Sequence, residues 1–175
     1  MSSPVSDLFE RVFRPVRDPK LAERIAFLQT LSLLKDLTAT QAGKLLTECV
    51  ERGYGPGDTI FSEGDQGNAL FIIVSGFVAI TKKNESGEST TLVNLGPGTH
   101  FGELALLDAL PRSASAIAID QTTVLILYKA NFDALVSRRT DIGLPIMTAV
   151  AENLARQVRR LNEQVYRMKT DKPAG

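Results

Sequence analysis

The chain has few of the residues that make covalent or metal cross-links. Its 175 residues include one cysteine, Cys49, and one histidine, His100. One cysteine cannot form an internal disulfide, and we interpret Cys49 as a small buried apolar group in a helix. One histidine excludes a metal site built from several histidines, and we interpret His100 as a turn residue.

An excess of charge and long apolar runs are missing as well. Twenty basic and twenty acidic residues cancel, which argues against a general electrostatic attraction to nucleic acid. No uninterrupted apolar run reaches transmembrane length. Asp7 and Glu10 interrupt the amino-terminal apolar segment, which argues against a signal peptide. We therefore expect a cytoplasmic protein with no membrane span.

What the chain does have is enough apolar sequence for one domain with a helical appendage, since 43% of its residues are hydrophobic. Its patterns divide it into four regions. These are an amino-terminal helical segment (1–35), a β-roll domain (36–136), a lid or dimerisation helix (137–170) and a tail (171–175).

Three helical patterns precede the first strand-like segment. Apolar residues recur at helical spacing over residues 8–13, with arginines beside them. This segment either lies on a membrane surface or docks its aromatic side chains on the domain or on a partner. A start signal at Pro19 predicts a helix over residues 19–35. A capping box beginning at Thr38 predicts another, which ends at Gly53.

From Tyr54 onward the chain changes to short apolar runs separated by turns that contain glycine. Such runs indicate strands, and we expect them at residues 59–61, 70–74, 77–81, 90–95, 114–119 and 124–128. Short strands at regular spacing indicate a barrel or jelly roll. The predicted fold class is therefore α+β, an antiparallel β-roll flanked by amino-terminal helices and a long carboxy-terminal helix.

The carboxy-terminal helix carries a heptad seam. After Pro145, gaps of four and three alternate between the apolar residues Met147, Ala151, Leu154, Val158, Leu161, Val165 and Met168. This spacing just reaches the length needed for a coiled coil. The seam either pairs with a second copy or folds onto its own barrel as a lid over a ligand, with Leu154, Val158 and Leu161 as the lid candidates. One helix can do both through different faces.

Residues of the types that bind anionic ligands lie closest together between Gly98 and Ile119. Gly102 and Glu103 open a short helical run, where unpaired N–H groups and the positive end of the helix dipole suit an anion. Glycine also lets the backbone approach a ligand closely. Arg112 adds a permanent charge and a planar fork of donors that matches two phosphate oxygens.

Two segments of this group, Phe101-Gly102-Glu103-Leu104-Ala105 and Pro111-Arg112-Ser113-Ala114, resemble the phosphate-binding cassette of cyclic-nucleotide-binding domains in residues and spacing. The resemblance extends over about residues 33–136. It implies that a cyclic nucleotide is bound by Phe101, Gly102, Glu103, Leu104, Ala105, Arg112, Ser113 and Ala114.

The resemblance also implies roles for individual residues. Glu103 matches the glutamate that accepts a hydrogen bond from the ribose 2′-hydroxyl, a contact that deoxy analogues lack. Ser113 occupies a position where kinase sites for cyclic AMP usually have alanine, sites for cyclic GMP often have threonine and the catabolite activator has serine. The base therefore stays open between cyclic AMP and cyclic GMP, with a lean to cyclic AMP. Ala114 and Ala116 either leave room for a ligand or fill the barrel.

We therefore expect a cyclic-nucleotide receptor without a cofactor or catalytic activity. Glu103 and Asp108 as an acid–base pair are disfavoured, because no nucleophile, metal-ligand set or second base accompanies them. Ligand binding would order the cassette and move the carboxy-terminal helix, with Gly143 and Pro145 as hinges because both residue types break helices.

The output of such a receptor is less defined by the sequence. The chain ends after its long helix, so we expect no helix-turn-helix and no DNA binding from it. Its effector partner is unknown. Two alternatives remain open: a degenerate module of the same fold that binds no ligand, and the sensor part of a transcription regulator.

Overall fold

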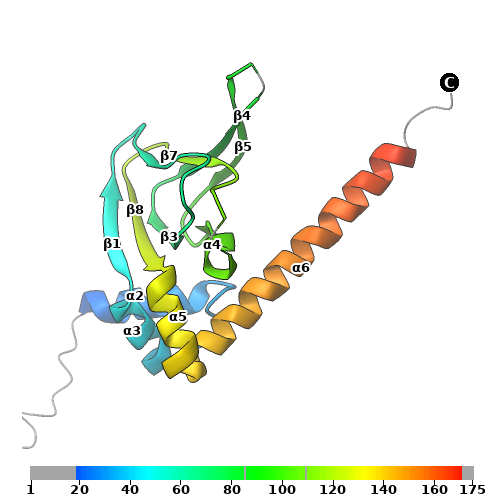
Figure 1. Cartoon of the computed structure of the whole chain (residues 1–175). Coiled ribbons are helices and arrows are strands. Elements are labelled where there is room, and N and C mark those ends of the chain that lie inside the picture. Colours follow the sequence, from blue (N-terminus) through cyan, green and yellow to red (C-terminus); the bar gives the residue numbers. More distant parts are fainter. Residues whose placement is uncertain (1–18, 85, 109, 171–175) are drawn as a thin grey trace, which may run out of the picture.

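The computed structural model describes residues 19–84, 86–108 and 110–170 (Figure 1). Its elements are α2 (Pro19–Thr30), α3 (Ala39–Thr47), β1 (Val50–Tyr54), β2 (Thr59–Phe61), β3 (Ala69–Ser75), β4 (Val78–Lys83), β5 (Ser89–Leu95), β6 (His100–Phe101), α4 (Leu104–Leu107), β7 (Ser115–Ala118), β8 (Thr122–Tyr128), α5 (Lys129–Arg138) and α6 (Thr140–Thr170). No helix within these ranges is long and apolar enough to cross a membrane.

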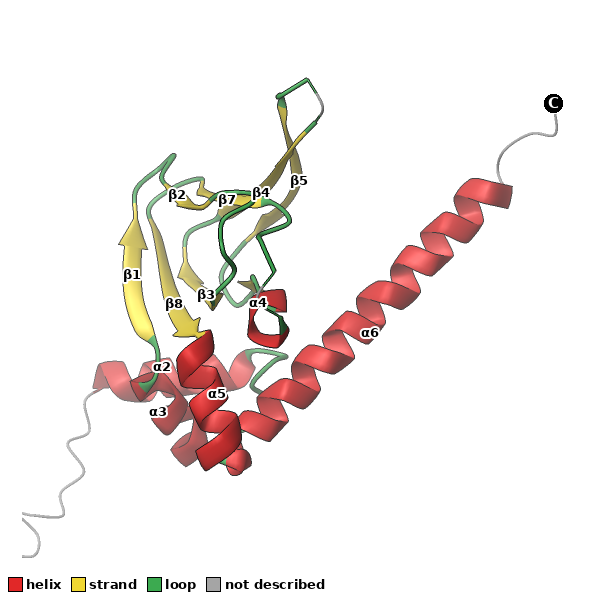
Figure 2. Cartoon of the chain, in the orientation of Figure 1, coloured by secondary structure: helices red, strands yellow, loops and turns green. Residues whose placement is uncertain are grey.

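Two four-stranded antiparallel sheets form a roll, with helices gathered at one end of it (Figure 2). One sheet has the strand order β1-β8-β3-β6, and the other has the order β2-β7-β4-β5. Their facing sides enclose a barrel core that includes Phe71, Val78, Phe101 and Val124. The predicted antiparallel β-roll with flanking helices is confirmed.

Strand β3 is buried on both faces for most of its length. Phe71 and Ile73 pack into the barrel core, whereas Leu70 and Ile72 pack among the helices. Because successive side chains of a strand point to opposite faces, an unbroken apolar run is what such a strand requires. Phe132 of α5 and Ile146 of α6 belong to the same helical core as Ile72.

Helix α2 ends at Thr30, five residues before the end that the sequence predicted. The backbone N–H groups of Leu31, Leu34 and Leu37 each donate to a carbonyl three residues earlier, at 3.2, 2.9 and 3.0 Å. Residues three apart lie on the same side of such tight turns, and all three leucines are buried. The apolar pattern thus continues past Thr30 although the α-helix does not.

Helix α3 starts at the predicted capping box, in which Thr38 Oγ1 accepts from the Gln41 N–H at 3.3 Å and Gln41 Oε1 accepts from the Thr38 N–H at 2.9 Å. The helix ends at Thr47, and the expected continuation to Gly53 is wrong. Residues 50–54 instead form β1, because their backbone pairs with β8 at the edge of the sheet.

Cys49 therefore lies in the turn between α3 and β1 and not in a helix. It packs against the helical core, partly buried. Burial raises the pKa of its thiol to about 12, and the neighbouring Glu48 acts in the same direction. The interpretation as an apolar packing group is confirmed, and such a thiol is unreactive at neutral pH.

Helix α6 runs unbroken through Gly143 and Pro145, so the expectation that these residues interrupt the helix is wrong. Pro145 has no N–H for the carbonyl of Asp141, and Gln41 Nε2 donates to that carbonyl at 2.7 Å in its place. A Cβ on residue 143 would lie 2.5 Å from the backbone of Val136. Glycine and proline here fit α6 onto α3 and α5.

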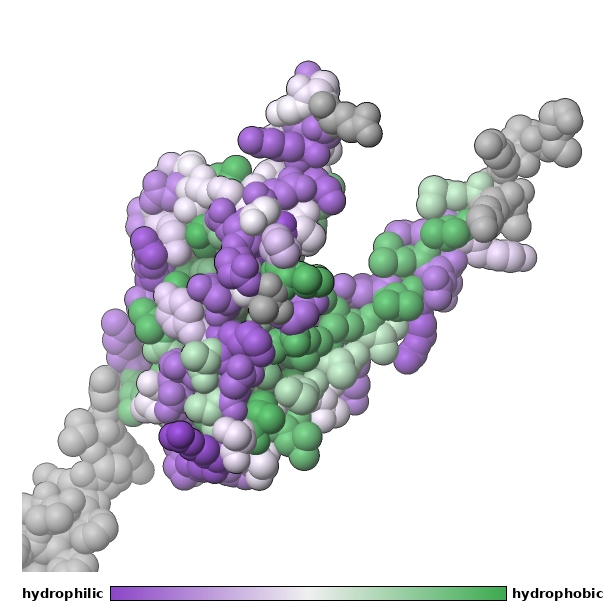
Figure 3. Space-filling model, in the orientation of Figure 1, coloured by the Kyte–Doolittle hydropathy of each residue, from purple (hydrophilic) through white to green (hydrophobic). Residues whose placement is uncertain are grey.

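The second half of α6 extends away from the roll (Figure 1), and its side chains from Arg156 to Met168 are exposed. Figure 3 shows hydrophobic residues along this projecting part. Val158 and Leu161 are 56% and 58% exposed. The helix predicted over residues 8–13 and the tail at 171–175 lie outside the described residues.

Candidate functional site

A cavity of about 480 Å³ opens where the roll, the segment 102–114 and α6 meet. Strands β2, β4, β5 and β6 contribute one side of it, and α6 contributes Gln157. The eight residues predicted to bind a ligand all line this cavity: Phe101, Gly102, Glu103, Leu104, Ala105, Arg112, Ser113 and Ala114. The structure therefore brings the eight predicted residues together around one cavity, and their role in binding stays a prediction.

Position 102 requires glycine for two reasons: its backbone conformation and the closeness of neighbouring atoms. Its φ is +77°, which L side chains rarely adopt. A Cβ on this residue would lie 2.7 Å from Arg112 Nη1 and 3.1 Å from the Ala69 carbonyl oxygen. The absence of a side chain thus lets the backbone of the segment approach the guanidinium closely.

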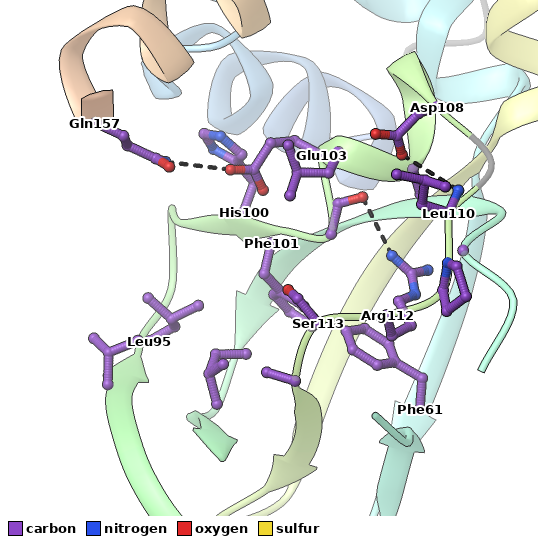
Figure 4. Close-up of a pocket in the computed structure, with 18 residues that line it drawn as sticks. Phe61, Leu95, His100, Phe101, Glu103, Asp108, Leu110, Arg112, Ser113 and Gln157 are labelled. Atoms are coloured by element: carbon purple, nitrogen blue, oxygen red, sulfur yellow. Dashed lines mark hydrogen bonds between the residues drawn. The ribbon is translucent and has the colours of Figure 1, made fainter. Parts of the chain in front are cut away.

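Arg112 is only 8% exposed, and its guanidinium is held in place from several sides. Nη2 donates to the Ala69 carbonyl at 2.9 Å. Nη1 donates to the Gly102 carbonyl at 3.3 Å (Figure 4). The guanidinium carbon lies 4.2 Å from the centre of the Phe61 ring and 5.5 Å from that of Phe71. Such a fork is oriented before any ligand arrives.

The charge of Arg112 is only partly compensated. Burial lowers its pKa from the ordinary value, and the nearby Asp65 carboxylate acts in the opposite direction. A guanidinium stays protonated at neutral pH even so, because its ordinary pKa is above 12. Arg112 Nε is buried and has no hydrogen-bond partner among the described residues. A buried cation with an unused donor suits an anionic ligand.

Glu103 lies directly before the short helix α4 and does not cap it with its side chain. Its Oε1 accepts instead from Gln157 Nε2 of α6 at 3.3 Å (Figure 4). Asp108 also lines the cavity, and its Oδ1 accepts from the Leu110 N–H at 3.4 Å. The two carboxylates thus have different partners, one on α6 and one two residues along the chain.

His100 is part of strand β6 and not of a turn, so that interpretation is wrong. It pairs with Ile72 of β3 and lines the cavity beside Glu103 (Figure 4). Its Nε2 is buried without a partner among the described residues. Burial lowers the pKa of His100, and the Glu103 carboxylate acts in the opposite direction.

The small residues after Arg112 divide between the two roles that the sequence left open. Ser113 is exposed and Ala114 is buried, and both line the cavity. Ala116 belongs to the barrel core. One alanine therefore leaves room at the cavity wall, and the other fills the interior of the roll.

The lid candidates do not cover the cavity in this arrangement. Leu154 packs against the helical core, and neither Val158 nor Leu161 is among the lining residues. Gln157, which the sequence analysis missed, is the residue of α6 that lines the cavity. The heptad pattern marks apolar positions only, and Gln157 is a polar residue beside the seam. The pattern therefore gave no signal for Gln157.

Comparison with known proteins defines the family. Residues 51–139 match the family described as the cyclic nucleotide-binding domain. The chain belongs to this family. This family is defined by ligand binding and not by a catalysed reaction. The match covers the roll, the cassette and the closing helix α5.

Individual proteins that bear the domain are similar to this chain in sequence or in structure over most of its length. The cyclic AMP receptor protein of Thermus thermophilus is 39% identical over 132 residues, which is 75% of this chain and 57% of that protein. The cAMP-dependent protein kinase regulatory subunit of Yarrowia lipolytica is 34% identical over 127 residues, or 73% of this chain and 31% of that protein. The crystal structure of the Thermus thermophilus catabolite activator protein has a TM-score of 0.72 at 33% identity, covering 79% of this chain and 63% of that one.

Proposed function

We propose that this cyclic nucleotide-binding domain is a sensor that binds cyclic AMP in the cavity and signals through α6. The observation that carries the proposal is Arg112, a buried cation with an unused donor, fixed beside Gly102 at the cavity wall. A cyclic phosphodiester has one negative charge, which one guanidinium balances. We assign this domain ligand binding and no reaction.

The two charged residues of the cassette have different roles in this proposal. Arg112 binds the phosphate oxygens, for which its planar fork is suited. Glu103 accepts from the ribose 2′-hydroxyl, as the matching glutamate does in the family motif. The chemistry supports this division, because a carboxylate beside a phosphate would repel it, whereas a hydroxyl donates to it. Both side chains line the same cavity.

The choice of cyclic AMP rests on two supports. The relatives compared above are named for cyclic AMP, and Ser113 at the cavity matches the residue of the catabolite activator at this position. Ser113 is also compatible with cyclic GMP, because a hydroxyl both donates and accepts. Cyclic GMP is therefore the alternative that a direct comparison of the two nucleotides must test.

The proposed output is a change in α6, read by a partner. This chain spans about half or less of the relatives compared above, so the effector and any attached output domain are open. We propose that the exposed seam of α6 pairs with a second copy of the chain. The support is four apolar residues, Val158, Leu161, Val165 and Met168, that are exposed in the single chain. A cytoplasmic location stays a prediction.

Parallel calorimetric titrations with cyclic AMP and cyclic GMP test the proposal. We expect saturable binding of one nucleotide per chain, with cyclic AMP the tighter ligand. Tighter binding of cyclic GMP would overturn the base assignment and leave the sensor assignment intact. No binding of either nucleotide by folded protein would favour the degenerate module instead.

A further inference from the structure

A hydrogen bond joins α6 to Glu103 of the cassette. Three side chains from different elements lie together at this end of the cavity: His100 from β6, Glu103 before α4 and Gln157 from α6 (Figure 4). The Gln157 amide donates to the Glu103 carboxylate at 3.3 Å. One oxygen of the carboxylate that is assigned to the ribose therefore has a partner within the chain.

The contact comes from the part of α6 where packing ends. Val150 is buried and Leu154 is partly buried against the helical core, whereas the side chains from Arg156 onward are exposed. Gln157 is thus one turn beyond the packed part of the helix. Its bond to Glu103 joins the projecting half of α6 to the roll across 54 residues of sequence.

Gln157 also lines the cavity itself. Its amide donates to Glu103 Oε1, and Glu103 lines the same cavity. A ribose hydroxyl that donates to the same carboxylate oxygen, Oε1, would meet the amide there. Two donors that need one place compete, and each weakens the binding of the other by the same factor.

We propose that Gln157 is an internal competitor for Glu103: its amide holds α6 to the cassette without ligand, and the ribose 2′-hydroxyl displaces it and releases the projecting half of the helix. This inference rests on the proposed function, because it needs a ribose at Glu103. Gln157 is then a positioning residue that also sets the affinity for the ribose form of the nucleotide.

The effect on affinity should be modest. The amide is exposed and its bond is long, and a single hydrogen bond changes an equilibrium by about two- to tenfold. We expect Gln157→Ala to tighten binding of cyclic AMP by about threefold. Gln157→Lys gives Glu103 a charged partner and should weaken binding by a similar factor.

The 2′-deoxy analogue separates this competition from a general effect on the fold. The analogue has no hydroxyl to displace the amide, so Gln157→Ala should leave its affinity unchanged. Gln164→Ala is the matched control, because Gln164 lies seven residues further along the same face of α6 and is exposed. We expect this control to bind both nucleotides as the unaltered chain does.

The position of α6 gives a second readout that needs no nucleotide. Spin labels at Thr91→Cys and Glu163→Cys, both exposed positions, report the distance between β5 and the projecting half of the helix. An excess of unlabelled chain removes any signal between copies. We expect Gln157→Ala to broaden this distance distribution in the unliganded protein and cyclic AMP to broaden it in the unaltered chain. Gln164→Ala should change nothing.

Two results would overturn the inference while the sensor assignment stands. Weaker cyclic AMP binding by Gln157→Ala would make the amide a ligand contact and not a competitor. Equal affinities and equal distances for Gln157→Ala and Gln164→Ala would mean that the bond to Glu103 has no effect. If the unaltered chain binds no nucleotide, the proposed function fails, and competition with ribose fails with it. The distances then still show whether Gln157 restrains α6.

Discussion

At the scale of single residues, Arg112 has a structural role besides the ligand-binding role that we propose for it. Its guanidinium donates to two carbonyls and stacks on Phe61, so its orientation is set before a phosphate arrives. Preorganisation of this kind lowers the entropy lost on binding. Gly102 shares in it, because the close approach of residue 102 to the guanidinium leaves no room for a side chain.

We expect Gly102→Ala to lose both stability and affinity. A non-glycine residue at φ +77° is strained by about 1–2 kcal/mol, and the new Cβ would displace the guanidinium. Affinity for cyclic AMP should fall about tenfold, the value of one charge-assisted hydrogen bond. Gly57→Ala is the control, since its φ is +83° and nothing lies within 4 Å of its Cβ.

Urea unfolding and calorimetric titration of both variants separate the two effects. Both should lose similar stability, and only Gly102→Ala should lose affinity. An equal fall in affinity for Gly57→Ala would contradict the role given to the contact with Arg112.

His100 makes stability depend on pH. Burial lowers its pKa in the folded protein below the ordinary value of 6.5, so the unfolded chain binds a proton at a higher pH than the folded protein does. The free energy of unfolding should therefore fall as pH decreases below about 6.5, by at most about 1.4 kcal/mol per pH unit. It should stop falling once the folded protein also binds the proton.

Urea unfolding between about pH 5.5 and 7 measures this slope, and His100→Gln should remove it. The chain has no other histidine to contribute. The Asp141 carboxyl, whose pKa is lowered by its hydrogen bonds from Arg139, titrates at more acid pH than this window. The same slope in His100→Gln would contradict the assignment to this side chain.

At the scale of elements, the sequence predicted the strands whose apolar residues form a recognisable pattern within a short stretch of chain. The apolar runs placed β2, β3, β4, β5, β7 and β8 within one or two residues. Strand β1 was missed because its first four residues are exposed at the edge of the sheet and show no apolar alternation. Strand β6 has two residues, which is too short for any period. The resemblance to the cassette could be recognised because its residues lie close together in the chain.

Contacts between distant elements had no such signal. The bond between Gln157 and Glu103 joins residues 54 apart. Proline and glycine in α6 misled the prediction, because their effect depends on what lies beside them. Gln41 supplies the donor that Pro145 lacks, and Val136 occupies the space beside Gly143. Both partners come from other helices, which a local pattern cannot reveal.

The seam of α6 gives a prediction at this scale. We expect the chain to dimerise with increasing concentration, because pairing would bury Val158 and Leu161, each more than half exposed. Leu161→Glu places a carboxylate in the seam and should keep the chain monomeric in sedimentation equilibrium. Arg160→Glu places one beside the seam and should still dimerise. Equal behaviour of the two variants would argue against pairing through this face.

At the scale of the whole molecule, the helical core and the barrel core meet at the two-faced strands β3 and β8. The cavity is lined by Phe61 and Phe101 of the barrel core and by Gln157 of α6, and α6 extends from the helical core away from the roll (Figure 1). We therefore expect a ligand at Arg112 and Glu103 to lie between the roll and α6, whose second half projects from the roll (Figure 1). This arrangement supports the sensor that we propose, because occupancy of the cavity would change the contact between Gln157 and Glu103.

The most direct test of this account is a calorimetric titration of cyclic AMP into the unaltered chain and into Arg112→Lys. Lysine keeps the charge and loses the planar fork. Far-UV circular dichroism and urea unfolding establish that the variant is folded. We expect one binding site per chain, with an affinity at least about tenfold lower in the variant. Equal affinity in a folded Arg112→Lys protein would mean that the phosphate does not lie on Arg112.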